Sequence, residues 1–318
     1  MHRKRTKLSR RAHHVALAVE RRGIRATYEL HDRLLSNPAS RRRFEHGRPQ
    51  LDDVQRTIVG ALDRDGYATV SLADLAVDRA LESEIEQQGA GFVETTEAAL
   101  RGESNGAGAD GLHRHVGKEF VVRLHSYGAH LDLRDAWFRL CLSHRMLDVA
   151  NAYLRLWSKL EYVDVWYTVP QSDESERKAS QRWHRDYNDR HLCKAFLYLV
   201  DVDEDTGPFE YVPGSAGDGP YAQDWAWRPL GDNYPPQEEL ARRIPAEAVR
   251  TFTAPKGTII FCNTSGFHRG GFATAKPRVL ATVTYSSPAS LASLTERNYS
   301  LDADVVAGLD DTQRYAVS

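Results

Sequence analysis

Short runs of β-branched and aromatic residues fill the second half of the chain, and they restrict its fold more than any other feature. From residue 160 onward these runs read EYVDVWYTV, KAFLYLVDV, GTIIFCN and RVLATVTYS, and clusters of Gly, Pro, Asp and Ser separate them. Runs of this length and composition are typical of β-strands that are joined by turns. The pattern predicts an antiparallel sandwich or jelly roll with helices packed around it.

The first hundred residues predict helices instead, because apolar residues recur there at three- and four-residue spacing. A Gly-rich polar stretch then predicts a loop, and the chain after it predicts a strand and one long amphipathic helix. The segments are helices at 16–35 and 54–62, a helix start at 71–74, the loop at 101–118, a strand at 119–126, the long helix at 133–157 and an inserted helix at 237–243.

We therefore predict an α+β fold, with a double-stranded β-helix core (a cupin-like jelly roll) and a helical N-terminal region packed around it. The 318 residues are expected to form one domain. Within it, 1–118 would be mainly helical, 119–290 would form the β core with the functional site, and 291–318 would be a C-terminal extension. A chain of this length can bury a sizeable core without disulfides or structural metal ions to stabilise it.

Charge is distributed unevenly along the chain. Residues 1–48 carry 14 Lys and Arg against 4 Asp and Glu, a balance of +10, whereas the net charge of the whole chain is −2. A basic region of this kind suits an anionic partner, although a solvated helical face is the simpler interpretation. Neither a zinc finger nor a basic motif interleaved with aromatic residues accompanies it, which argues against nucleic-acid binding.

Features of membrane and secreted proteins are not evident in the sequence. No apolar run approaches the length of a membrane span, and no apolar segment follows the basic start as in a secretory signal. The three cysteines, Cys141, Cys193 and Cys262, lie far apart in apolar surroundings. They are interpreted as reduced and buried, which predicts a cytoplasmic protein. The sequence does not determine the oligomeric state.

One short motif carries chemistry. His184 and Asp186 are two residues apart at the start of an expected strand, so an imidazole and a carboxylate would face the same side. The best third ligand is His268, which follows a buried strand and a turn in KGTIIFCNTSGFHRGG. Two histidines and one carboxylate leave three positions open on an octahedral metal. This set suits iron(II), which must also bind a bidentate cosubstrate and O2.

A basic residue is placed to hold that cosubstrate. Arg278 lies ten residues after His268, and its guanidinium is suited to grip a carboxylate such as the distal end of 2-oxoglutarate. Lys194, at the start of the strand that follows His184 and Asp186, is a second candidate to bind a carboxylate of the cosubstrate or the substrate. A solvated strand end explains Lys194 equally well.

These residues carry a resemblance to a known family. The run WHRDYNDRHLCKAFLYLVDVDEDTGPFEYVPGS, then PKGTIIFCNTSGFHRGG and Arg278, resembles the phytanoyl-CoA dioxygenase family over about 160–290. The resemblance implies a double-stranded β-helix with iron on His184, Asp186 and His268, and 2-oxoglutarate on Arg278. It also implies that 2-oxoglutarate is decarboxylated while a C–H bond is oxidised. Related halogenases lose the carboxylate, so Asp186 favours hydroxylation or another oxidative outcome over halogenation.

The family does not fix the substrate, because one fold hosts many reactions. Charged and aromatic residues expected near the site favour a small polar molecule, such as a specialised or sugar-containing metabolite. Those residues are Arg123, Tyr127, Arg185, Asp189 and Arg190, and the proposed substrate contacts are Arg185, Tyr187, Arg190 and Tyr211. Two other functions stay open: a cupin-like metal-binding module without oxygenase activity, and a protein whose basic N-terminal region docks a partner.

Overall fold

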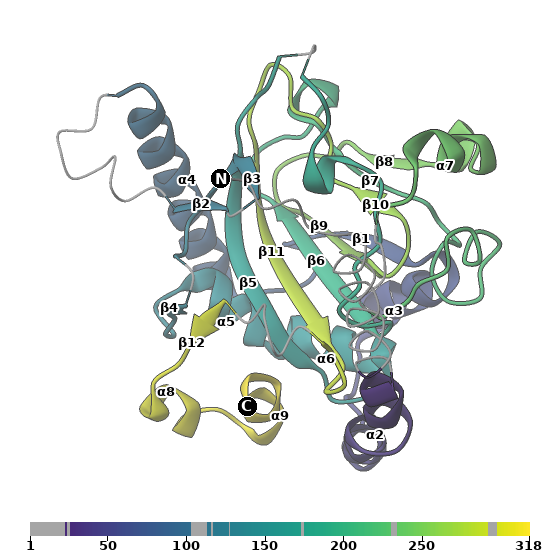
Figure 1. Cartoon of the computed structure of the whole chain (residues 1–318). Helices are drawn as coiled ribbons and strands as arrows, with labels where there is room; N and C mark the ends of the chain where they lie inside the picture. The colour runs from purple at the N-terminus through teal and green to yellow at the C-terminus, as the bar shows by residue number, and fades with distance from the viewer. Residues whose placement is uncertain are drawn as a thin grey trace, which may run out of the picture.

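A seven-stranded antiparallel sheet forms the centre of the protein, with the strand order β1-β9-β6-β11-β5-β3-β2 (Figure 1). The structure is a computed structural model that describes residues 23, 26–102, 113–115, 117–126, 128–172, 175–229, 234–291 and 298–318. The strands of the large sheet are β1 (Tyr67–Ser71), β2 (His113–His115), β3 (Lys118–Arg123), β5 (Lys159–Thr168), β6 (Leu192–Tyr198), β9 (Thr258–Cys262) and β11 (Arg278–Ser286).

A smaller antiparallel sheet, ordered β10-β7-β8, packs on one face of the large sheet. Its strands are β7 (Phe209–Tyr211), β8 (Arg250–Phe252) and β10 (His268–Arg269). Aromatic and aliphatic side chains of both sheets form one buried cluster, which joins Phe209 and Phe252 to Phe196 and Leu280. The short strands β4 (Ala129–His130) and β12 (Tyr299–Ser300) form a separate parallel pair.

Helices cover the opposite face of the large sheet (Figure 1). They are α3 (Asp53–Asp65), α4 (Arg79–Leu100), α5 (Ala136–Leu142) and α6 (His144–Leu154). The shorter helices α2 (Ser36–His46), α8 (Ala303–Ala307) and α9 (Asp311–Val317) lie at the same end of the molecule as α6, whereas α7 (Gln237–Arg243) lies beside β8 of the smaller sheet (Figure 1). None of the helices in the described part of the chain is long and apolar enough to cross a membrane. The main core therefore lies between α3–α6 and the sheet.

Side chains of β11 alternate between the two faces, as the two-residue period of a strand requires. Val279, Ala281 and Val283 belong to the core beneath the helices, whereas Leu280 belongs to the cluster between the sheets. The same strand thus supports the fold on one side and faces the smaller sheet on the other.

Two segments differ from the sequence-based expectation. The single long helix expected at 133–157 is wrong, because it is split at Ser143, whose extended backbone (ψ 149°) ends α5 and begins α6. A helix was expected to start at 71–74, but α4 begins at Arg79 behind its N-cap Asp78. The helical region also contributes β1, which pairs with β9 after Gly66 reverses the chain in a left-handed conformation (φ 78°).

A buried network of charged groups links β3, β5 and α5. Arg123 donates to Asp164, and the ring of His125 contacts Asp164 at 3.2 Å through Nδ1 and Asp135 at 2.7 Å through Nε2. Asp135 also accepts the backbone N–H of Phe138 at 2.6 Å and so caps α5. Arg123 was expected near a substrate, but its charge is balanced within this network.

Candidate metal centre

Three side chains of metal-ligand type, His184, Asp186 and His268, meet between the two sheets. His184 and His268 exchange two backbone hydrogen bonds of 3.0 Å, and Asp186 donates its N–H to the carbonyl of Thr264 at 2.8 Å. Because alternate residues of an extended chain point the same way, His184 and Asp186 both face His268. One ligand atom from each residue lies within 4.8 Å of the other two.

The turn before His268 depends on a glycine. A Cβ on Gly266 would lie 2.6 Å from the Tyr211 hydroxyl oxygen, so no larger residue fits while Tyr211 holds its place. Tyr211 is fully buried and donates to the carbonyl of Asn263 at 3.1 Å. It therefore supports the turn from behind.

Both imidazoles are oriented by backbone carbonyls. Nδ1 of His184 lies 2.8 Å from the carbonyl of Arg182, and Nδ1 of His268 lies 3.0 Å from the carbonyl of Gly266. Since a carbonyl only accepts, each Nδ1 carries the proton and each Nε2 keeps its lone pair. Burial lowers the pKa of His184 well below its usual range and the pKa of His268 to about 4. Both rings are therefore neutral at pH 7, as metal binding requires.

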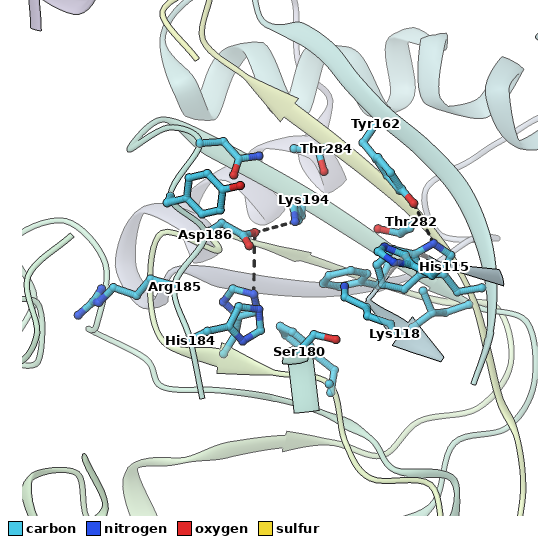
Figure 2. Close-up of a pocket in the computed structure, with 18 of the residues that line it drawn as sticks. His115, Lys118, Tyr162, Ser180, His184, Arg185, Asp186, Lys194, Thr282 and Thr284 are labelled. Atoms are coloured by element: carbon cyan, nitrogen blue, oxygen red, sulfur yellow. Dashed lines mark hydrogen bonds and ion pairs between the residues drawn. The ribbon is translucent and has the colours of Figure 1, made fainter. Parts of the chain in front are cut away.

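The carboxylate of Asp186 completes the set. Burial raises its pKa, but the ammonium of Lys194, 2.6 Å away, and the two neighbouring histidines outweigh burial and hold the pKa well below its usual range. Figure 2 shows Asp186 between Lys194 on one side and the histidines on the other. Two neutral imidazoles and one ionised carboxylate are the donor set that fits iron(II) with three open positions.

Arg278 brings a buried guanidinium to the same cavity. Its Nη1 donates to the carbonyl of Gly207, while its Nε has no hydrogen-bond partner in the described part of the chain. No carboxylate of the described residues forms an ion pair with it, and burial lowers its pKa. A Cβ on Gly270 would lie 3.1 Å from Nη2, so this glycine makes room for the guanidinium. The arrangement suits an anion that enters from outside the chain.

A cavity of about 270 Å³ surrounds these groups (Figure 2). Apolar side chains from three strands, Phe196, Phe209 and Leu280, form one part of its lining. Polar and aromatic side chains form the rest, among them Lys118, Tyr162, Trp166, Ser180, Tyr234 and Thr284. A cavity of this size is slightly smaller than the roughly 300–1,000 Å³ typical of small-molecule sites.

The structure brings together part of the residue set expected from the sequence. Lys194, Tyr187 and Arg278 line the cavity with the three ligand-type residues. Arg185 contributes to the lining, but its guanidinium turns away (Figure 2) and donates to loop carbonyls, including those of Ser215 and Ser265. The guanidinium of Arg185 therefore holds loops together, while the residue itself borders the cavity.

Other expected substrate residues lie elsewhere. Arg190 pairs with Glu29 and lies 5.3 Å from the centre of the Tyr28 ring, so it anchors the N-terminal helical residues 26–33. Asp189 is fully buried and accepts from Tyr28 at 2.8 Å. Tyr211 lies behind the turn, as described above, and Tyr127 lies outside the described residues. Neither Arg190 nor Tyr211 lines the cavity.

Several lining residues were not expected. Tyr162 and Trp166 are four residues apart on β5, so the two-residue period of a strand places both aromatic side chains on the same face, and this spacing in EYVDVWYTV was a usable signal for them. The Tyr162 hydroxyl accepts from Trp166 Nε1 and donates to Asp164, both at 3.1 Å. His115 and Lys118 come from the hairpin of β2 and β3, within the segment 101–118 that was expected to be a loop and in which no motif indicated them.

The chain is similar to one protein family and to several solved structures. The sequence model of the phytanoyl-CoA dioxygenase (PhyH) family matches residues 62–279. Among solved structures, EctD from S. alaskensis with 2-oxoglutarate and 5-hydroxyectoine is 18% identical, with 76% of this chain and 79% of that chain covered and a TM-score of 0.49.

Two further solved structures are similar to the chain. The epimerase SnoN in complex with Fe3+, alpha ketoglutarate and nogalamycin RO is 19% identical, with coverage of 73% and 83% and a TM-score of 0.44. AviO1 from Streptomyces viridochromogenes is 17% identical, with coverage of 76% and 98% and a TM-score of 0.46. No curated protein matches the chain.

Proposed function

Because the chain belongs to the phytanoyl-CoA dioxygenase family, we propose that it is an oxygenase dependent on iron(II) and 2-oxoglutarate that oxidises a C–H bond of a small molecule. Iron, 2-oxoglutarate and O2 are the cofactor and cosubstrates of this family. The observation that carries the proposal is one cavity lined by a His-Asp-His cluster and by a buried arginine without a carboxylate partner among the described residues.

Each residue of the site takes a distinct task in this proposal. His184, Asp186 and His268 would hold iron through Nε2, a carboxylate oxygen and Nε2. When bound, iron supplies the oxidative decarboxylation of 2-oxoglutarate to succinate and CO2, coupled to oxidation of the substrate. Arg278 binds the distal carboxylate of 2-oxoglutarate through two N–H groups. Phe196, Phe209 and Leu280 exclude water from that part of the cavity, which strengthens the ion pair.

The fold also supports proposals about the architecture, the domain organisation and the location of the protein. We take the seven-stranded and three-stranded sheets, joined by the cluster of Phe196 and Phe209, as the two sheets of a double-stranded β-helix. We also propose that 1–318 is a single domain, because side chains of the N-terminal helices α3 and α4 share one core with the strands. The three cysteines are buried and free, in keeping with a cytoplasmic location.

The substrate class that we propose is a small polar metabolite, as in specialised-metabolite biosynthesis, and hydroxylation is the proposed outcome. Its support is the polar part of the lining, which includes Ser180, Asn188, Thr282 and Thr284. A basic N-terminal region that docks an anionic partner stays a proposal, because residues 1–22 lie outside the described part of the chain.

Anaerobic titration tests the proposal. Iron(II) and then 2-oxoglutarate are added to the purified protein, and the visible charge-transfer band of the chelate is followed. We expect a saturable band and, after admission of O2, formation of succinate. A protein that binds iron but shows neither band nor succinate would be a cupin-like metal-binding module, and a protein that binds neither would favour the docking function.

A further inference from the structure

Two threonines of β11 bring hydroxyl groups to the cavity wall. Thr282 and Thr284 line the cavity and are 2% and 3% exposed, and neither hydroxyl has a hydrogen-bond partner among the described residues. Because alternate residues of a strand point to the same face, the two side chains lie on one surface, roughly 7 Å apart along the strand. Figure 2 shows both on the part of the wall between Lys194 and Tyr162. A buried hydroxyl needs a partner, which a ligand or a water molecule must then supply.

The polar neighbours of Thr284 are engaged with other groups. Strand pairing places Thr284 between Tyr162 of β5 and Lys194 of β6. The ammonium of Lys194 contacts Asp186 at 2.6 Å, and the hydroxyl of Tyr162 donates to Asp164 at 3.1 Å. The charge of Lys194 is therefore balanced without Thr284, and the threonine hydroxyl faces the cavity.

The neighbours of Thr282 leave its hydroxyl in the same position. Strand pairing places Thr282 between Asp164 of β5 and Phe196 of β6. Asp164 accepts from Arg123 through Oδ2 and from the backbone N–H of His125 through Oδ1, so both of its oxygens are occupied. Phe196 offers no polar group. Because the charges on this part of the wall are already paired, a neutral hydrogen-bonding group fits it better than an ion, which would need a countercharge.

We propose that Thr282 and Thr284 bind two hydroxyl groups of the substrate, which is therefore a polyhydroxylated molecule such as one with a sugar or cyclitol ring. This inference rests on the proposed function and names the substrate class of the same site. A threonine hydroxyl both donates and accepts, as a substrate hydroxyl does, so each pair forms in either direction. The separation of the two threonines is close to the width of a six-membered ring with hydroxyls at opposite positions. An apolar substrate in this place would leave both threonine hydroxyls unpaired, which selects against it.

Two probes of similar size test this inference: trans-cyclohexane-1,4-diol and trans-4-methylcyclohexanol, in which a methyl group replaces one hydroxyl. Each is titrated calorimetrically, without O2, into protein saturated with iron(II) and 2-oxoglutarate. We expect the diol to bind roughly 2–10-fold more tightly, which corresponds to the net contribution of one hydrogen bond, about 0.5–1.5 kcal/mol. An apolar wall would give the opposite order, because it favours burial of the methyl group.

Variants assign the preference to the two threonines. Thr282→Val and Thr284→Val each remove a hydroxyl and keep the branched shape, and each should weaken diol binding by roughly 2–10-fold. Thr282→Ser and Thr284→Ser keep the hydroxyl and should retain the preference for the diol. Thr206→Val is the matched control, because Thr206 is equally buried but its hydroxyl donates to the carbonyl of Asp203 at 2.7 Å, outside the cavity lining. It should bind both probes like the wild type.

Thermal unfolding without ligands gives a second measurement. Thr206→Val removes a hydrogen bond within the protein and should lower the Tm by a few degrees. Thr282→Val and Thr284→Val remove no hydrogen bond within the part of the chain that the structure describes, so their Tm should be unchanged or higher. A fall in Tm as large as that of Thr206→Val would show that these hydroxyls serve the fold, and it would overturn the inference.

The outcomes separate this inference from the proposed function. If the 2-oxoglutarate band forms but the diol binds no more tightly than methylcyclohexanol, or neither probe binds, the inference is overturned and the oxygenase proposal stands. If the valine variants weaken 2-oxoglutarate and leave the diol unchanged, Thr282 and Thr284 belong to the cosubstrate site, which also overturns it. If no band forms in the wild type, the proposed function itself fails.

Discussion

The ammonium of Lys194 lies 2.6 Å from Oδ2 of Asp186, one of the three proposed iron ligands. Lys194 is on β6, whereas Asp186 is on the extended segment that pairs with the turn before β10. The ion pair neutralises a buried carboxylate before any metal is bound, and its cation competes with iron for the same oxygen. Stability without metal and affinity for metal are therefore opposed at this position.

Lys194→Met should separate the two effects. Loss of a hydrogen bond to a charged group is expected to lower the stability of the metal-free protein by about 1.5–3 kcal/mol, while iron(II) affinity rises because nothing competes for Asp186. Denaturant unfolding without metal and an anaerobic iron titration measure these changes. Lys276→Met, which removes an exposed partner of Asp203, should leave both quantities almost unchanged, because water and salt screen exposed ion pairs. Weaker 2-oxoglutarate binding with unchanged iron affinity would instead make Lys194 a cosubstrate residue.

Arg278→Ala should weaken the binding of 2-oxoglutarate and leave the binding of iron(II) unchanged. Removal of one partner of a buried ion pair costs about 3–5 kcal/mol, which is roughly a hundredfold or more in affinity. The charge-transfer band, titrated with 2-oxoglutarate, reports this change, and Arg278→Lys should recover only part of the loss because an ammonium lacks the bidentate fork. Equal affinity of wild type and Arg278→Ala for 2-oxoglutarate would remove this residue from the site.

Gly270→Ala tests the position of the same guanidinium without removing it. The new Cβ would lie 3.1 Å from Nη2 of Arg278, so the side chain must shift from its preferred conformation. Such a shift costs about 0.5–1.5 kcal/mol, or roughly twofold to tenfold in 2-oxoglutarate affinity. The control is Gly60→Ala in α3, where nothing lies within 4 Å. It should raise stability by about 0.5–1 kcal/mol and leave the cosubstrate unaffected.

Substitution of any one of the three proposed iron ligands should sharply lower the affinity for iron(II). His184→Ala, Asp186→Ala and His268→Ala should each reduce iron(II) affinity by more than the roughly 10–100-fold that loss of an outer hydrogen-bond partner causes. Anaerobic equilibrium dialysis gives the affinity, and circular dichroism reports the fold. His144→Ala is the control, since His144 contacts Asp148 and Asp310 on the surface. Normal iron binding by a variant that lacks both His184 and His268 would refute the assignment.

His125 predicts a pH dependence of stability. Burial lowers its pKa, but hydrogen bonds to Asp135 and Asp164 outweigh burial and raise the pKa to about 9. Because the folded pKa lies above the unfolded value of about 6.5, the stabilisation, up to roughly 3 kcal/mol, is complete below pH 6.5 and is lost as pH rises through 9. Urea unfolding between pH 6 and 10 should therefore show that wild type and His125→Gln differ less in their free energy of unfolding at high pH. A difference in free energy that is constant across this range would contradict the assigned charge.

The cluster of His184, Asp186 and His268, our proposed metal ligands, could be selected from the sequence because its chemistry is local. The two-residue spacing of His184 and Asp186 sets their common direction, and the strand and turn before His268 mark it as the end of a neighbouring element. The residues that line the cavity were harder to predict, because their positions depend on the register in which the strands pair. Tyr162 stands opposite Thr284 only through the pairing of β5 with β11, and that pairing joins segments more than a hundred residues apart.

The partners of the charged residues were harder to predict. Arg185 and Arg190 were proposed as substrate contacts, and Arg123 was expected near the site. Each instead satisfies carbonyls or carboxylates of the protein. A sequence shows that a charge is present but not which partner neutralises it, so the role of a buried arginine is decided by tertiary structure.

The alternation of β11 has a consequence for how new specificities arise on this scaffold. Residues 280, 282 and 284 line the cavity, whereas 279, 281 and 283 pack beneath the helices. Mutations in the first set reshape the chamber without opening a void in the helix-packed interior, and mutations in the second set damage the interior without touching the chamber. The residues of this strand that stabilise the fold are therefore different from those that shape the cavity. A library of variants at positions 280, 282 and 284 should yield folded proteins with altered substrate selectivity.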